Sequence, residues 1–234
     1  MNQTALVALK QLLTGLVVAA LTAVAVAEPG IIVPSDDLAI GILHGMLATE
    51  LLESSGKPSR RAAQAVPGSS TVVQISSAAV MPAKLAAHLP AQQQPSATRT
   101  YQQVLDGYRQ IETRLRVPRN DLAGAVAAFI AGSWMAYRDR DLPDEHFAPL
   151  VRQMRQIIGS NADFRAAGQR EKQEMYEQMA ILGTSMALTR EGLKRQPDAR
   201  TQARMRDAAK GYLEQFLKTD ADRVDISAQG LSLR

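Results

Sequence analysis

The sequence has 234 residues, no cysteine, and 27 basic against 23 acidic side chains, for a formal net charge of +4. Without cysteine, disulfide bonds, lipid attachment through a thiol and thiolate metal sites are all excluded. The fold must therefore be stabilised by its own hydrophobic core.

Residues 5–27 have the pattern of a secretory signal peptide. Lys10 is the only charge before Glu28, the stretch from Leu12 to Val26 is apolar, and residues 25–27 (Ala-Val-Ala) provide the small side chains of a cleavage site. The alternative is a retained membrane anchor, but no basic stop-transfer flank follows the apolar stretch. We therefore expect cleavage near Ala27 and a periplasmic or secreted protein.

Residues 28–99 have the composition of a linker. All ten aromatic residues lie between Tyr101 and Phe216, whereas seven of the eleven prolines fall between residues 28 and 99. Such a segment buries too little apolar surface to offset the entropy of ordering it. Two islands interrupt the linker: an amphipathic pattern that predicts a short helix over 36–53, and a short strand over 71–80 that would dock on the domain or on a partner.

From residue 100 the apolar residues are spaced as in helices. A first helix carries a stripe from Tyr101 to Leu115 and ends before Pro118. Asn120 or Asp121 then caps a second, strongly apolar helix that runs to Tyr137. This second helix repeats small residues every four positions and is too short to span a bilayer, so it is predicted to form the centre of the core.

Three further helices and an extended tail complete the predicted domain. One helix spans Phe147 to Ile158 with Pro149 in its first turn, a second begins near Ala162 or Gln169, and a third follows Pro197. Residues 224–233 alternate apolar and polar around Gly230. The sequence thus predicts an all-α bundle of about five helices over residues 100–234, with a short extended C-terminal tail.

Three segments of this domain carry a family resemblance. Residues 119–139, 172–183 and 222–231 resemble an uncharacterised family of exported bacterial helical proteins, and the resemblance covers residues 100–234. These motifs are typical of packing rather than of chemistry. The resemblance therefore implies a helical fold and assigns no functional residue.

No catalytic, cofactor or metal motif stands out in the chain. The histidines (His44, His88 and His146) are far apart and form no ligand pair, and no serine lies in a nucleophile elbow. Asp220, Asp222 and Asp225 lack the glycine and the final glutamate of a calcium loop. We accordingly predict no catalytic residue, no cofactor and no metal.

Two rival functions stay open at this point. An envelope hydrolase would need two convergent carboxyl groups, for which the candidates are Asp121, Asp139, Asp141, Asp144, Glu145 and Glu174. A periplasmic chaperone would use the methionine stripe Met175, Met179 and Met186 as an open groove, although this spacing is more often that of core residues.

Basic residues are concentrated between Arg190 and Lys210, a segment that contains seven basic and three acidic residues. Such a stripe is suited to an acidic protein partner or an anionic membrane surface, whereas the plainer interpretation is a solvated helix face. The candidate partner-binding residues are Arg190, Lys194, Arg200 and Arg204. We expect a non-enzymatic interaction or scaffold protein of the cell envelope or of a secretion-related assembly, without a nucleic-acid partner.

Overall fold

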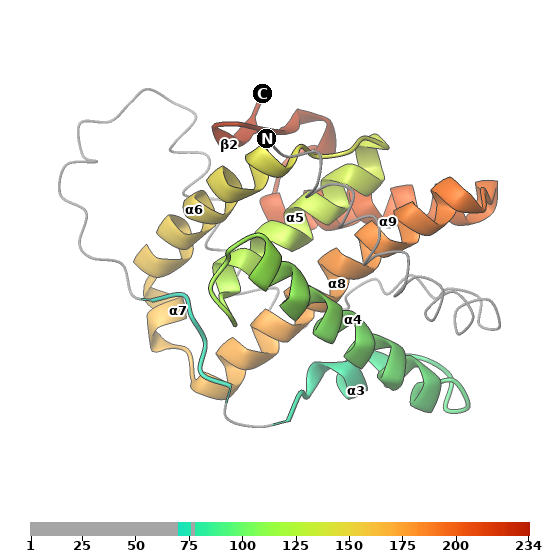
Figure 1. Ribbon diagram of the computed structural model, residues 1–234, viewed down its shortest axis with the longest axis horizontal. Helices are drawn as coiled ribbons and strands as arrows, with labels where there is room; N and C mark the ends of the chain where they lie inside the picture. Colours follow the sequence, from blue (N-terminus) through green and yellow to red (C-terminus); the bar gives the residue numbers. More distant parts are fainter. Residues whose placement is uncertain (1–69, 76–77) are drawn as a thin grey trace.

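The computed structural model describes residues 70–75 and 78–234, and it is mainly helical (Figure 1). The predicted signal peptide and the predicted helix over 36–53 lie outside these residues. In chain order, the described elements are α3 (Met81–Ala86), α4 (Gln94–Arg114), α5 (Leu122–Arg138), α6 (Asp144–Ser160), α7 (Ala162–Ala166), α8 (Gln169–Arg195), α9 (Ala199–Leu217), the 3-10 turn η2 (Ala221–Arg223), β1 (Val224–Ser227) and β2 (Gly230–Leu233).

Helix α5 is the central element of the bundle. It packs against α6, α8 and α9 and is buried along almost its whole length (Figure 1). Of the two predicted caps, Asn120 and Asp121, Asp121 is the one that caps the helix, because its side chain accepts a hydrogen bond from Ala123 N. The helix ends at Asp139, which adopts a left-handed conformation with φ 48°. The prediction of a central apolar helix is confirmed.

The contact between α5 and α8 is a close approach of two backbones. A Cβ atom built on Gly132 would lie 2.3 Å from the carbonyl oxygen of Gly183, and one on Gly183 would lie 2.5 Å from Phe129 N. Neither position can hold a larger side chain without moving a helix. Helix α8 therefore packs on the face of small residues that was predicted on α5.

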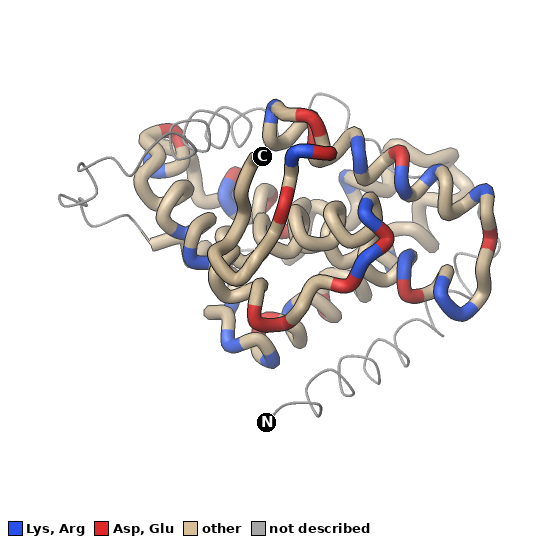
Figure 2. Tube along the Cα trace, turned by 90° about the horizontal axis from the view of Figure 1, so that it is seen from above, with Lys and Arg blue, Asp and Glu red and all other residues tan. Residues whose placement is uncertain are grey.

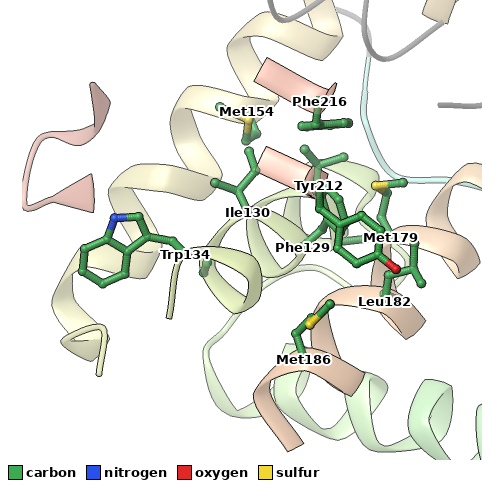
Figure 3. Close-up of a cluster of buried hydrophobic side chains, with 14 of the residues drawn as sticks. Phe129, Ile130, Trp134, Met154, Met179, Leu182, Met186, Tyr212 and Phe216 are labelled. Carbon is green, nitrogen blue, oxygen red and sulfur yellow. The ribbon is translucent and has the colours of Figure 1, made fainter. Parts of the chain in front are cut away.

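The core is formed by large side chains of α5, α6, α8 and α9 (Figure 3). Phe129 packs against both Tyr212 and Phe216, with ring centroids 5.7 and 5.0 Å apart. Met175, Met179 and Met186 are buried among these residues. The methionine stripe is therefore part of the core, as its spacing favoured, and it does not line an open groove.

The extended tail folds back as an antiparallel hairpin of β1 and β2 beside α6. Trp134 Nε1 donates to Val224 O at 3.2 Å, and the Gln153 amide bonds both the N–H and the carbonyl group of Leu231. These contacts fix the hairpin to the bundle. The predicted fold class, all-α with a short extended C-terminal segment, is confirmed.

Two helix starts differ from the prediction. Helix α4 begins at Gln94, before residue 100, because Pro95 occupies its first turn, where a missing N–H is tolerated. Helix α6 begins at Asp144, so Pro149 lies inside the helix and beyond its first turn. Asp144 and Glu145 instead occupy that turn, where negative charge is favourable.

Residues 70–75 and 78–86, which we call the strap, pack on the bundle although they belong to the predicted linker. Leu122 N donates to Thr71 O and Val73 N donates to Asn120 O, both at 2.9 Å, and Val73 is buried. Within the described residues of the predicted strand over 71–80, which are 71–75 and 78–80, the β-pairing is a single bridge between Val72 and Asp121.

Helix α3 anchors the second half of the strap. The buried carboxylate of Glu177 accepts hydrogen bonds from Val80 N and Met81 N at the start of α3, at 2.8 and 2.9 Å. Met81 and Leu85 add apolar contacts with the core. The packed domain therefore extends N-terminally beyond the predicted boundary at Thr100. The segment lacks aromatic residues, and it is held instead by the buried carboxylates of Asp121 and Glu177 and by a few aliphatic side chains.

None of the helices in the described part of the chain combines the length and hydropathy needed to cross a bilayer.

Candidate functional site

The four predicted partner-binding residues lie on two successive helices. Arg190 and Lys194 are near the end of α8, whereas Arg200 and Arg204 are in the first half of α9. Figure 2 shows that basic and acidic positions are interspersed along the trace. The segment from Arg190 to Lys210 is thus not a uniform basic surface, and its members need separate treatment.

Arg190 is not available to a partner. Its side chain is only 7% exposed and forms ion pairs with Asp139 (3.2 Å) and Asp141 (2.6 Å), which lie in the connection after α5. Arg190, one of the predicted partner-binding residues, thus lies in an intramolecular ion-pair network and not on an open helix face. The sequence could not show that this connection folds back over the last turns of α8.

Lys194 is also paired, although it is more exposed. Its ammonium group donates to Asp141 at 2.7 Å and to Glu191 at 2.6 Å. Burial opposes the charged form, but the hydrogen bonds to Asp141 and Glu191 outweigh it and raise the pKa of Lys194. Burial likewise opposes ionisation of Asp141, yet Lys194 and Arg190 lower its pKa. Lys194 belongs to a structural ion-pair network.

Arg200 and Arg204 remain at the surface of α9. Arg200 is exposed and Arg204 is half-buried, and their spacing of four residues places them on one side of the helix. Asp198 caps α9 through Thr201 N at 2.6 Å, and this hydrogen bond lowers its pKa. Of the four predicted residues, Arg190 is the one that the fold buries, whereas Lys194 and Arg200 are exposed and Arg204 is half-buried.

The candidate carboxyl groups for hydrolysis are engaged in structural contacts. Asp139 and Asp141 pair with Arg190, and Glu174 pairs with Lys84 (2.7 Å) and Arg170 (3.1 Å). Asp144 and Glu145 occupy the first turn of α6, three and four residues after Asp141. Asp139 and Asp141 thus lie near each other as partners of one guanidinium group, whereas Glu174 belongs to a separate ion-pair cluster.

A different pair of carboxyl groups meets at the junction of α4 and α5. Asp121 is fully buried, and it accepts hydrogen bonds from Thr71 Oγ1 and from Arg155 Nη2, each at 2.5 Å. Glu112 is 1% exposed, and its Oε1 accepts a hydrogen bond from the hydroxyl group of Tyr176 at 3.0 Å. Among the described residues, Glu112 Oε2 and the nearby Tyr108 hydroxyl have no hydrogen-bond partner.

The surroundings of Glu112 at this junction change the pKa of its carboxyl group. Burial is the largest effect on Glu112 and raises its pKa to about 7, despite hydrogen bonds from Tyr176 and from the backbone of Asn120 and Asp121. Asp121 adds to the shift through charge repulsion. Both side chains are buried, so this pair of carboxyl groups lies inside the fold and is placed away from a substrate in solvent.

The chain was compared with known families and proteins. The model of a family of unknown function, DUF6683, matches residues 46–234. The chain belongs to this family. No curated protein and no solved structure matches it. The predicted resemblance to an uncharacterised family is thus confirmed, and the DUF6683 match begins upstream of the predicted boundary at Thr100, in agreement with the packed strap.

Sequence analysis of this DUF6683 chain missed Glu112 and Glu177. Glu112 lies four residues after Tyr108, on the apolar face of α4, and Glu177 lies between the buried Met175 and Met179. A charged residue in register with an apolar stripe was the available signal, because such a residue must be buried with a partner or change its pKa.

The histidines and the C-terminal acids give no metal centre in the described residues. No group of three histidine or acidic side chains lies close enough to hold an ion there. His44 falls outside these residues, His88 is exposed and His146 is half-buried. Asp222 accepts hydrogen bonds from Tyr137 (2.9 Å) and Arg138 (3.0 Å), so it fixes the turn η2 to α5.

Proposed function

We propose that the chain is an exported, non-enzymatic interaction module of the cell envelope that binds an acidic partner protein through α9. The observation that carries the proposal is the position of Arg200 and Arg204, one turn apart at the surface of this helix. Arg190 and Lys194 are held by acidic neighbours on the same protein, so they add little to the field that a partner would meet.

Several features support binding rather than catalysis. The acidic side chains that a hydrolase would use are ion-paired, capping or buried, and the methionine stripe belongs to the core. In the described residues, Val72, 45% exposed, is the one large exposed hydrophobic side chain. A partner for this surface is therefore recognised by charge rather than by an apolar patch.

The test is a charge reversal, Arg200→Glu with Arg204→Glu, in the full chain expressed in a bacterium. The protein recovered from the periplasm should have the intact mass of a chain that begins at Glu28. Crosslinking in envelope extracts should capture a partner with the unaltered protein, and the double variant should lose roughly tenfold or more of it, because oppositely charged surfaces would now repel.

The matched control is Arg152→Glu with Arg165→Glu, which changes the charge equally at exposed positions on α6 and α7. The control should capture the partner as the unaltered protein does. Equal capture by all three proteins at low and high salt would place the binding site elsewhere, and co-fractionation with anionic vesicles alone would favour a membrane surface over a protein partner.

A further inference from the structure

Glu112 lies where the helices α4, α5 and α8 meet, and its neighbour Asp121 is bonded to two further parts of the fold. Its own helix α4 contributes Tyr108 and Arg109, α8 contributes Tyr176, and the start of α5 contributes Asp121. Asp121 in turn is bonded to Arg155 of α6 and to Thr71 of the strap. A change of charge on Glu112 therefore changes its electrostatic interaction with Asp121, and through Asp121 it affects each element that Asp121 holds together.

The site accommodates a neutral carboxyl group better than a carboxylate. Glu112 Oε1 accepts a hydrogen bond from the Tyr176 hydroxyl group, and hydrogen bonds from the backbone of Asn120 and Asp121 also favour the carboxylate, but Oε2 is buried without a hydrogen-bond partner among the described residues and the effect of burial is larger than that of these donors. A carboxylate with a bare oxygen would be poorly solvated, and it would face Asp121. Two cations near this junction are already paired: Arg155 with Asp121 at 2.5 Å and Arg109 with Asp106 at 2.9 Å.

Residues 70–75, the first half of the strap, are bonded to residues 120–122, which include Asp121. Their backbone hydrogen bonds, from Val73 N to Asn120 O and from Leu122 N to Thr71 O, both reach residues 120–122. The hydrogen bond from Thr71 Oγ1 ends on Asp121 itself. Any movement that separates Asp121 from an ionised Glu112 displaces the acceptors and donors to which residues 70–75 are bound.

We propose that Glu112 is a proton-binding site that controls the docking of residues 70–75, which are held when its carboxyl group is neutral and loosened when it ionises. The pKa of about 7 that burial gives this group places the change in the neutral range.

The test measures amide hydrogen exchange by NMR in the full chain, as protection factors for Val73 and Leu122 at about pH 5.5 and about pH 8.5. Protection should fall roughly tenfold or more at the higher pH in the unaltered protein, because local opening exposes these amides. Glu112→Gln, which mimics the neutral form, should keep full protection at both values.

The matched control is Glu174→Gln, since Glu174 also contacts the strap, through Lys84, but from an ion pair at the surface. It should retain the pH dependence of the unaltered protein. Equal protection at both pH values, or the same loss in Glu112→Gln, would overturn the proposal.

A second measurement covers the case in which Glu112→Gln does not fold. The carboxyl ¹³C shift of Glu112 in the unaltered protein should titrate near pH 7, and Tyr176→Phe should raise the midpoint because the lost hydrogen bond favours the carboxylate. A midpoint below about pH 5.5 in the unaltered protein would contradict the assignment.

Discussion

Single buried side chains decide how the parts of this protein are joined. Asp121 caps α5 through Ala123 N, pairs with Arg155 of α6 and accepts a hydrogen bond from Thr71, so one carboxylate connects two helices and the strap. Glu177 fixes α3 in a similar way, because its carboxylate accepts hydrogen bonds from the first N–H groups of that helix. Buried carboxylates with several donors are costly to remove, because each lost acceptor leaves a donor unpaired.

At the residue scale, Glu112 should make stability depend on pH. Its pKa is raised from 4.5 to about 7 in the folded protein, so the folded state binds more protons than the unfolded state between these values. The stabilisation is present below pH 4.5 and is lost as the pH rises through 7. The free energy of unfolding should fall by on the order of 3 kcal/mol across this range.

Urea unfolding of the unaltered protein and of Glu112→Gln at about pH 5 and about pH 8 checks this expectation. Glu112→Gln should show a flat profile and be the more stable protein at the higher pH. A free energy of unfolding for the unaltered protein that rises over this interval would show that Glu112 is ionised in the fold. Glu174→Gln should leave the profile unchanged, because the pKa of Glu174 is lowered by Lys84 and Arg170 and it titrates below this interval.

At the scale of elements, the crossing of α5 and α8 depends on two glycines. Gly132→Ala places a methyl group where the Gly183 carbonyl oxygen lies, so the helices must separate and the protein should lose about 1–3 kcal/mol of stability. Thermal unfolding followed by circular dichroism measures the loss.

Gly211→Ala provides the contrast within the same bundle. A Cβ atom at Gly211 in α9 meets no atom within 4 Å, so alanine should raise stability by about 0.5–1 kcal/mol through its better helix propensity. Equal melting temperatures for the two variants would mean that the α5–α8 crossing is looser than the backbone contact indicates.

At the scale of the whole molecule, the strap belongs to the cooperative unit. A chain that begins at Met46, where the family match begins, should unfold at the same temperature as the full chain. A chain that begins at Thr100 should lose more than about 3 kcal/mol, because it lacks the buried Met81 and Leu85 and leaves Glu177 without its donors.

Calorimetry of the two truncated chains separates these outcomes. A chain from Thr100 with the stability of the longer one would restore the boundary that composition predicts. Retained helix content with a broad transition would show that the bundle forms but that its core is no longer cooperatively packed.

The sequence by itself determined the five long helices, narrowed the cap of α5 to Asn120 or Asp121, and favoured burial of the methionine stripe over an open groove. These features follow from local spacing and from side chains that bond within a few residues of their own position. Tertiary structure alone decided that Arg190 pairs with Asp139 and Asp141, that the aromatic-free strap is packed, and that Glu112 sits beside Asp121. Those contacts join residues far apart in the chain, and a carboxyl or guanidinium group has no fixed role until the fold sets its burial and its neighbours.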